Sequence, residues 1–158
     1  MAKSKKKSKS ALQYIKYGSV IMAIVGLIMT AFTFVHYGDT VFSGFNVIFG
    51  YTGTIGSTVT VSTQILLFSI LALLAILLPL IGAFSILFKN KIIRLVGALM
   101  MLAGTILCFL IPNFVVFAET IAAGVIQAAG ASLGIGAILA GVFFGIGTLC
   151  SLYAVIEK

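Results

Sequence analysis

Charged side chains are scarce in this chain. Of its 158 residues only 8% are Asp, Glu, Lys or Arg, whereas 61% are hydrophobic. A soluble domain carries about 25% charged residues, so this chain could not cover the surface of a soluble fold with polar groups. Its apolar stretches also reach the length of about 20 residues that crosses the hydrocarbon layer of a bilayer. The composition therefore predicts an integral membrane protein.

Groups that carry out catalysis or bind metals are scarce as well. The candidates are one histidine, three acids and two cysteines: His36, Asp39, Glu119, Glu157, Cys108 and Cys150. None of the acids falls deep within an apolar run, where membrane transporters and enzymes place their ionisable groups. A metal site needs several such ligands, and a Ser-His-Asp triad needs a buried acid. We therefore predict a protein that is not an enzyme, with no metal or cofactor; convergence of His36, Asp39 and Glu119 on the outer face is the remaining alternative.

The basic residues all lie on one side of a four-span layout. Six precede the first apolar run, three lie between the second and third runs, and one ends the chain: Lys3, Lys5, Lys6, Lys7, Lys9, Lys16, Lys89, Lys91, Arg94 and Lys158. Because cytoplasmic loops of membrane proteins carry an excess of Lys and Arg, both termini are predicted to be cytoplasmic. The net charge of +7 is then expected to face anionic lipid headgroups rather than nucleic acid.

The apolar runs divide the chain into a basic tail and one membrane domain. Residues 1–13 lack hydrophobic periodicity and are predicted to be a disordered cytoplasmic tail. Residues 14–158 are predicted to form the transmembrane domain, with spans near residues 14–35, 62–88, 92–111 and 131–156. The expected fold is an all-α integral membrane protein, a four-helix transmembrane bundle with both termini inside.

The first external segment, residues 36–62, combines aromatic and β-branched residues with Gly, Ser and Thr. A two-residue period within it predicts a short β-hairpin on the outer face. Four aromatic side chains of this segment are predicted to form a surface for an external partner: Phe42, Phe45, Phe49 and Tyr51. An aromatic loop with no binding role is the alternative.

The second external segment, residues 112–130, is too apolar for a solvated loop. An interfacial or re-entrant helix fits its pattern, and so does an extension of the third or fourth span. The sequence leaves these possibilities open.

Small residues recur along the fourth span at helical spacing, at Gly130, Gly134, Ala137, Gly141 and Gly145. In lipid, helices associate through the close backbone approach that small residues permit. This stripe is expected to face the other spans, with Gly97 and Gly104 of the third span opposite it. A homo-oligomer interface or the interface with another membrane protein is the alternative.

The second span contains Pro79, which removes a backbone donor and predicts a helix kink. Ser and Thr residues at membrane depth are expected to serve helix packing rather than to line a pore.

The plan of four spans, a longer first external segment with β character and a short internal turn resembles the layout of claudin-type tetraspan proteins. Claudins carry a tryptophan signature and a cysteine pair in their first external segment. This chain has no tryptophan, and its two cysteines fall in predicted spans. The resemblance is one of topology, and no functional residue is carried over from it.

These features favour a small non-enzymatic tetraspan protein of the plasma membrane that acts as a scaffold, an accessory subunit or a self-associating, partner-binding protein. The alternative is a small transporter or an oligomeric channel for ions or small solutes, which Pro79 and the glycine-rich fourth span would suit. Short loops without glycosylation sequons or external cysteines favour a prokaryotic membrane.

Overall fold

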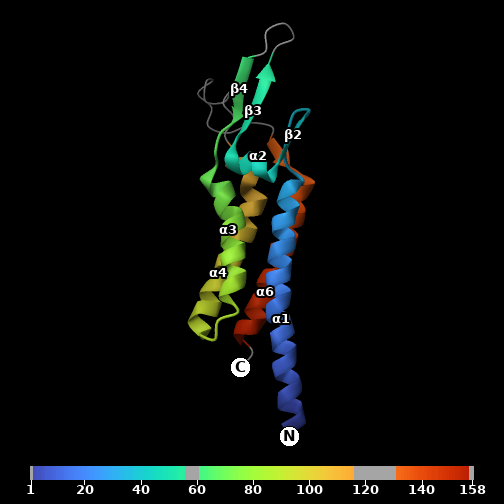
Figure 1. Cartoon of the computed structure of the whole chain (residues 1–158), viewed down its shortest axis with the longest axis vertical. Helices are drawn as coiled ribbons and strands as arrows, with labels where there is room; N and C mark the ends of the chain where they lie inside the picture. Colours follow the sequence, from blue (N-terminus) through green and yellow to red (C-terminus); the bar gives the residue numbers. More distant parts are fainter. Residues whose placement is uncertain (1, 56–60, 116–130, 157–158) are drawn as a thin grey trace.

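The computed structural model describes residues 2–55, 61–115 and 131–156 of the chain. These residues form an elongated molecule, with a bundle of helices at one end and short strands at the other (Figure 1). The bundle consists of α1 (Ala2–Ile28), α3 (Ile70–Ser85), α4 (Lys91–Leu110) and α6 (Ile135–Ile156). Helix α1 begins and helix α6 ends at the end of the bundle that lies away from the strands.

Three of these helices support the prediction of a membrane protein. The stretches Gln13–Ala31, Lys91–Asn113 and Ile135–Ile156 are long and apolar enough to cross a membrane. The first includes the short 3-10 helix η1 (Met29–Ala31), and the second includes η2 (Ile111–Asn113). Helix α3 is also apolar but has only 16 residues, a length of about 24 Å at ~1.5 Å per residue.

Both ends of the first predicted span differ from expectation. Helix α1 begins at Ala2 and thus runs through the residues predicted to be a disordered tail. Lys, Ala, Gln and Leu are strong helix formers, and the segment before Gly18 contains no Gly or Pro to interrupt the helix. At the other end the helical stretch stops at Ala31, and the β-branched residues after it enter strand β1 (Thr33–Tyr37) instead.

The second predicted span, residues 62–88, is only partly helical. Its first residues form strand β4 (Val61–Leu66), which pairs in antiparallel fashion with β3 (Tyr51–Ile55). Helix α3 starts after Ser69, whose side chain accepts a hydrogen bond from Ala72 N at 3.3 Å. The prediction of a 27-residue helix was therefore wrong, because a Val/Ser/Thr-rich tract favours the extended ladder that β3 provides.

The fold is not purely helical, because two small antiparallel sheets lie at one end of the bundle. In the first, β1 is central, with β2 (Thr40–Ser43) on one side and β5 (Ala131–Leu133) on the other. The chain turns from β1 to β2 at Gly38, whose φ of +56° is one that glycine adopts easily. Strand β5 directly precedes α6, so β1 ties the start of the fourth helix to the end of the first.

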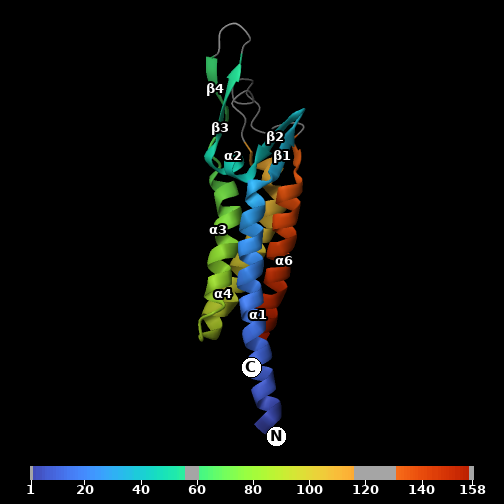
Figure 2. The same cartoon turned by 45° about the vertical axis from the view of Figure 1, so that its right-hand side comes forward.

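The predicted hairpin in the first external segment exists as an antiparallel pair, β3 and β4, which projects beyond the bundle (Figure 2). The structure adds a second antiparallel pair, β1 and β2, and a short helix between the two pairs, α2 (Gly44–Phe49). We refer to η1, α2 and the five strands together as the β cap. Residues 116–130, most of the segment predicted to be an interfacial or re-entrant helix, lie outside the described residues.

The four helices of the bundle pack around α6 and α4. Helix α6 contacts both α1 and α4, and α4 contacts α3, whereas α1 and α3 meet less extensively. Helices α3 and α4 follow each other as an antiparallel pair (Figure 1). The bundle is therefore closed mainly through three helix pairs, α1–α6, α6–α4 and α4–α3.

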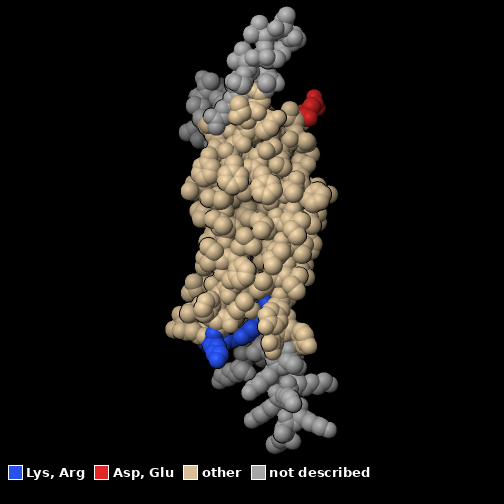
Figure 3. Space-filling view, in the orientation of Figure 1, with Lys and Arg blue, Asp and Glu red and all other residues tan. Residues whose placement is uncertain are grey.

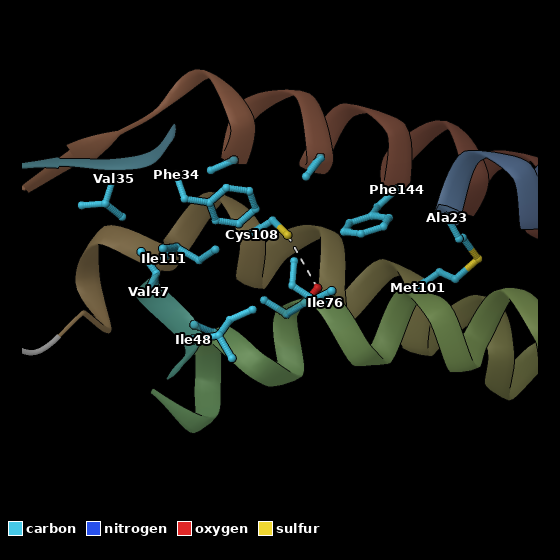
Figure 4. Packing of buried hydrophobic residues seen from close by; sticks show 14 of the residues in the cluster. Ala23, Phe34, Val35, Val47, Ile48, Ile76, Met101, Cys108, Ile111 and Phe144 are labelled. Atoms are coloured by element: carbon cyan, nitrogen blue, oxygen red, sulfur yellow. Dashed lines mark hydrogen bonds between the residues drawn. The ribbon is translucent and has the colours of Figure 1, made fainter. Parts of the chain in front are cut away.

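Buried apolar side chains form one continuous cluster that runs from the bundle into the β cap. Figure 4 shows Phe34 of β1 and Val47 and Ile48 of α2 lying near Ile111 of η2, which follows α4. All four side chains are buried. The β cap is thus packed onto the helices, so its exposed residues are held in place by the core beneath them.

Candidate functional site

Helix α2 is fixed to the end of the bundle by both of its caps and by its buried face. Ser43 accepts a hydrogen bond from Asn46 N at 3.3 Å, as an N-cap side chain does. Gly50, with φ of +88°, ends the helix and donates its N–H to Asn46 O at 3.0 Å. On the buried face, a Cβ atom on Gly44 would lie 2.7 Å from Thr30 O, so the helix start touches the η1 backbone.

The opposite face of α2 presents two aromatic side chains. Phe45 is 48% exposed and Phe49 is 64% exposed; because they are four residues apart, they lie on the same helix face. Tyr51, at the start of β3, is 41% exposed. We call these three residues the aromatic surface. A rigidly held group of exposed rings of this kind suits either a protein partner or the membrane interface.

Phe42 does not belong to this surface, and the prediction that it faces a partner was wrong. Its side chain is only 3% exposed, and its ring packs edge-on against Tyr51 with centroids 5.7 Å apart. Phe42 is the buried residue of strand β2, in which Thr40 and Val41 are exposed. Phe42 is therefore a buried packing partner of the Tyr51 ring.

The small residues of the fourth span lie in contacts of different kinds, one with a strand and others with helices. Gly134 approaches the backbone of β1, and a Cβ on Gly141 would lie 2.8 Å from the Phe109 ring of α4. Ala137 is fully buried. Gly145 is looser, since a Cβ there would meet only Thr105 Cγ2 at 3.7 Å. Gly130 lies outside the described residues, and an oligomer interface through this stripe remains a prediction.

Gly97 and Gly104 of α4 face α3 rather than α6, contrary to expectation. A Cβ on Gly97 would lie 2.7 Å from Gly82 O and 2.7 Å from Ser85 Cβ. Gly104 lies against Pro79, which is buried within α3. Pro79 thus has a packing partner, and the kink predicted for it remains a prediction.

A polar cluster joins three helices inside the bundle. The hydroxyl oxygens of Ser19 on α1 and Ser151 on α6 are 2.7 Å apart and share a hydrogen bond. The sulfur of Met101 on α4 lies 3.4 Å from the first and 3.1 Å from the second. Gly147 O is a further acceptor for both hydroxyls. Each buried hydroxyl therefore has partners from another helix, which specifies how the helices meet.

The sequence predicted that Ser and Thr residues at membrane depth serve helix packing, but it did not single out Ser19. A signal was present, because the buried residues of α1 and the η1 turn that follows it have a helical spacing of four, three and four. They are Ser19, Ala23 and Gly26 of α1 and Thr30 of η1. All four are small, so this face of α1 could have been identified as a second small-residue stripe.

The end of the bundle away from the β cap carries basic side chains, whereas Asp39 marks the other end (Figure 3). Lys89 and Lys91 are exposed, but Arg94 and Lys16 are half-buried. Arg94 donates from Nη1 to Ala154 O at 2.8 Å and from Nη2 to Lys89 O at 3.5 Å. Its Nε is buried and finds no hydrogen-bond partner within the described part of the chain.

Within residues 2–55, 61–115 and 131–156, no three His, Cys, Asp or Glu side chains come together as a metal site would require. His36 lies in β1 and Asp39 in the turn that follows it. Glu119, the third residue of the alternative outer site, lies outside the described residues.

Comparison of the chain with protein-family models, with curated proteins and with solved structures found no significant match. The class that the structure supports is a membrane protein with a helical bundle and a small β cap. We therefore infer its function from the geometry described above.

Proposed function

We propose that this chain is a small non-enzymatic tetraspan protein that binds another membrane protein through the aromatic surface. In this role it acts as a scaffold, an accessory subunit or a self-associating protein. The observation that carries the proposal is the exposure of Phe45, Phe49 and Tyr51 on a β cap whose buried residues pack onto the bundle.

The tetraspan arrangement requires α3 to cross the membrane with the three longer helices. Helix α3 packs along α4 through Gly82 and Gly97 near one end and through Pro79 and Gly104 further along. The mostly apolar residues 66–69 precede it and 86–88 follow it. Ser69 N donates to Ile48 O at 3.1 Å, so this part of the non-helical backbone has a partner inside the protein, as a lipid environment demands.

The orientation follows from the placement of charge. Lys16, Lys89, Lys91 and Arg94 belong to one end of the bundle, and Asp39 belongs to the other. Because basic residues are retained on the cytoplasmic side, the basic end is cytoplasmic and the β cap is external. Both termini are then inside a plasma membrane, which we propose to be prokaryotic, with the basic residues next to anionic headgroups.

Several features of the aromatic surface fit a protein partner. Exposed aromatic rings are enriched among the residues that dominate the energy of protein interfaces. Phe45 and Phe49 stand on a helix whose two ends are capped and whose other face is buried. A surface that is already ordered loses little conformational entropy when it binds.

Photo-crosslinking in cells tests this proposal. A photoreactive phenylalanine analogue at position 49 should give a discrete cross-linked protein on irradiation. Phe45→Ser should reduce that product by about tenfold or more, because loss of an aromatic anchor in an interface costs about 2 kcal/mol. A product of twice the chain's mass would identify a second copy as the partner.

The matched control uses Phe88, which is 58% exposed at the opposite end of the bundle. The analogue at position 88 should not give the same product, and Phe88→Ser should leave the product from position 49 unchanged. If the analogue at position 49 yields only lipid adducts, the aromatic surface lies in the membrane interface and the partner-binding proposal fails.

A further inference from the structure

Two basic residues at the end of the bundle away from the β cap are less exposed than the other basic side chains there. Lys16 on α1 and Arg94 on α4 are half-buried, and both belong beside Ala154 of α6. Arg94 Nη1 donates to Ala154 O at 2.8 Å. Lys16 lies about one helical turn from Ser19, whose hydroxyl oxygen is 2.7 Å from that of Ser151, and Ala154 lies one turn from Ser151 in the same direction. Lys89 and Lys91, by contrast, are exposed to their surroundings. Bringing two like charges together in a partly desolvated position is unfavourable unless an opposite charge joins them.

No carboxylate of the described residues supplies that opposite charge. Asp39 is the one acid among them, and it lies at the β cap, the other end of the molecule (Figure 3). The hydrogen bonds of Arg94 go to two backbone carbonyls, Ala154 O and Lys89 O. A carbonyl accepts a hydrogen bond but does not neutralise the guanidinium.

The guanidinium of Arg94 also has unused donors. Arginine carries five N–H groups in a planar fork, and Arg94 makes two hydrogen bonds, one of them long at 3.5 Å. Its Nε has no partner among the described residues. Phosphate oxygens are the acceptors that best match several N–H groups of one guanidinium, and a nearby lysine adds a point charge.

We propose that Lys16 and Arg94 form a binding site for one phosphate-bearing anion at the cytoplasmic end of the bundle. The site joins α1 to α4 beside the end of α6, where Arg94 already holds Ala154 O. The phosphate of an anionic phospholipid headgroup has this chemistry, and so does free inorganic phosphate. The site lies at the opposite end from the aromatic surface, so its test is independent of any protein partner.

Native mass spectrometry of the purified full chain in detergent tests the site by titration with phosphatidylglycerol. Lys16→Gln and Arg94→Gln should each weaken the binding of one phosphatidylglycerol by about fivefold, the factor expected for loss of one basic residue near a membrane surface. Lys91→Gln removes an exposed charge at the same end and should change binding by less than about twofold, since exposed charges are screened.

Arg94 also holds the end of α6 through its hydrogen bond to Ala154 O, so Arg94→Gln alters a helix contact as well as removing a charge. Thermal unfolding without added lipid separates this role from anion binding. If Arg94→Gln fails to fold, the test rests on comparing phosphatidylglycerol binding by Lys16→Gln with binding by Lys91→Gln. Lys16 does not take part in the hydrogen bonds that Arg94 makes to Ala154 O and Lys89 O.

Two further titrations identify the source of the phosphate. Phosphatidylcholine should bind with no difference among the variants, because its headgroup has no net charge. If inorganic phosphate displaces phosphatidylglycerol and shows the same dependence on Lys16 and Arg94, the site is confirmed with free phosphate as a ligand.

Equal weakening by all three glutamine variants, or none by Lys16→Gln, overturns the proposal. Tighter binding by Glu157→Gln would also overturn it, by identifying the chain's own carboxylate as the occupant.

Discussion

Replacing Gly97 with alanine is expected to lower the free energy of unfolding by about 2–3 kcal/mol. The new Cβ would lie 2.7 Å from Gly82 O and 2.7 Å from Ser85 Cβ. The first of these atoms belongs to the α3 backbone, so it can move only if the helix moves. Gly97→Ala should therefore push α3 away from α4 along the most closely packed helix pair of the bundle.

Cys108 provides the measurement. Its side chain is buried and its thiol is free, donating to Ala75 O on α3 at 3.6 Å (Figure 4). In a Cys150→Ala background, a thiol-reactive dye that fluoresces on coupling reports the thermal exposure of Cys108. The midpoint should fall clearly in Gly97→Ala.

Gly145→Ala is the matched control, because it makes the same chemical change on a neighbouring helix. Its Cβ would meet only Thr105 Cγ2 at 3.7 Å, an ordinary contact. We expect a change within about 0.5 kcal/mol, as is usual for substitutions without a clash. Equal destabilisation by the two variants would mean that the close approach of α3 to α4 is not what holds the pair together.

Replacing Gly134 with alanine is expected to separate β5 from β1 and to cost about 3 kcal/mol. The Cβ would lie 2.7 Å from Thr33 C and 2.8 Å from Phe34 C, both backbone atoms of β1. The clash should also break the hydrogen bond from Gly134 N to Phe34 O, which is 2.8 Å long. Because β5 leads directly into α6, the start of that helix should loosen as well.

Hydrogen exchange of the purified protein measures this effect locally. Exchange at residues 33–37 should rise in Gly134→Ala but not in Ser132→Ala, which changes an exposed side chain of β5, two residues away. A rise of the same size in both variants, or in neither, would show that the contact at Gly134 does not secure the β cap to the bundle.

The apolar runs made the helical bundle predictable but not the point at which helix gives way to strand. Residues 61–66 form strand β4 yet lead without a break into the apolar run of α3. Their state depends on β3, with which they pair in antiparallel fashion. The sequence predicted a hairpin in this region but not how far its second strand extends, so the second helix was predicted to begin several residues too early.

The partner of each small residue could not be predicted for a related reason. Gly97 and Gly104 were correctly singled out as sites of close approach, but their spacing is compatible with either neighbouring helix. The order in which the helices pack, α1, α6, α4, α3, decides between these neighbours. That order is set by the contacts of all the helix pairs together, which the spacing of two glycines does not reveal. The same holds for Phe42 and Phe45, since burial distinguishes them only after β2 and α2 have formed.

The most direct test of the account is whether α3 crosses the membrane, because residues 39 and 89 are separated by α3 alone among the bundle helices. In a chain with Cys108→Ala and Cys150→Ala, single Asp39→Cys and Lys89→Cys variants are treated in cells with a membrane-impermeant maleimide. We predict labelling of position 39 in intact cells and of position 89 only after permeabilisation. Labelling of both positions from the same side, or of position 89 alone in intact cells, would contradict the four-span arrangement and its orientation.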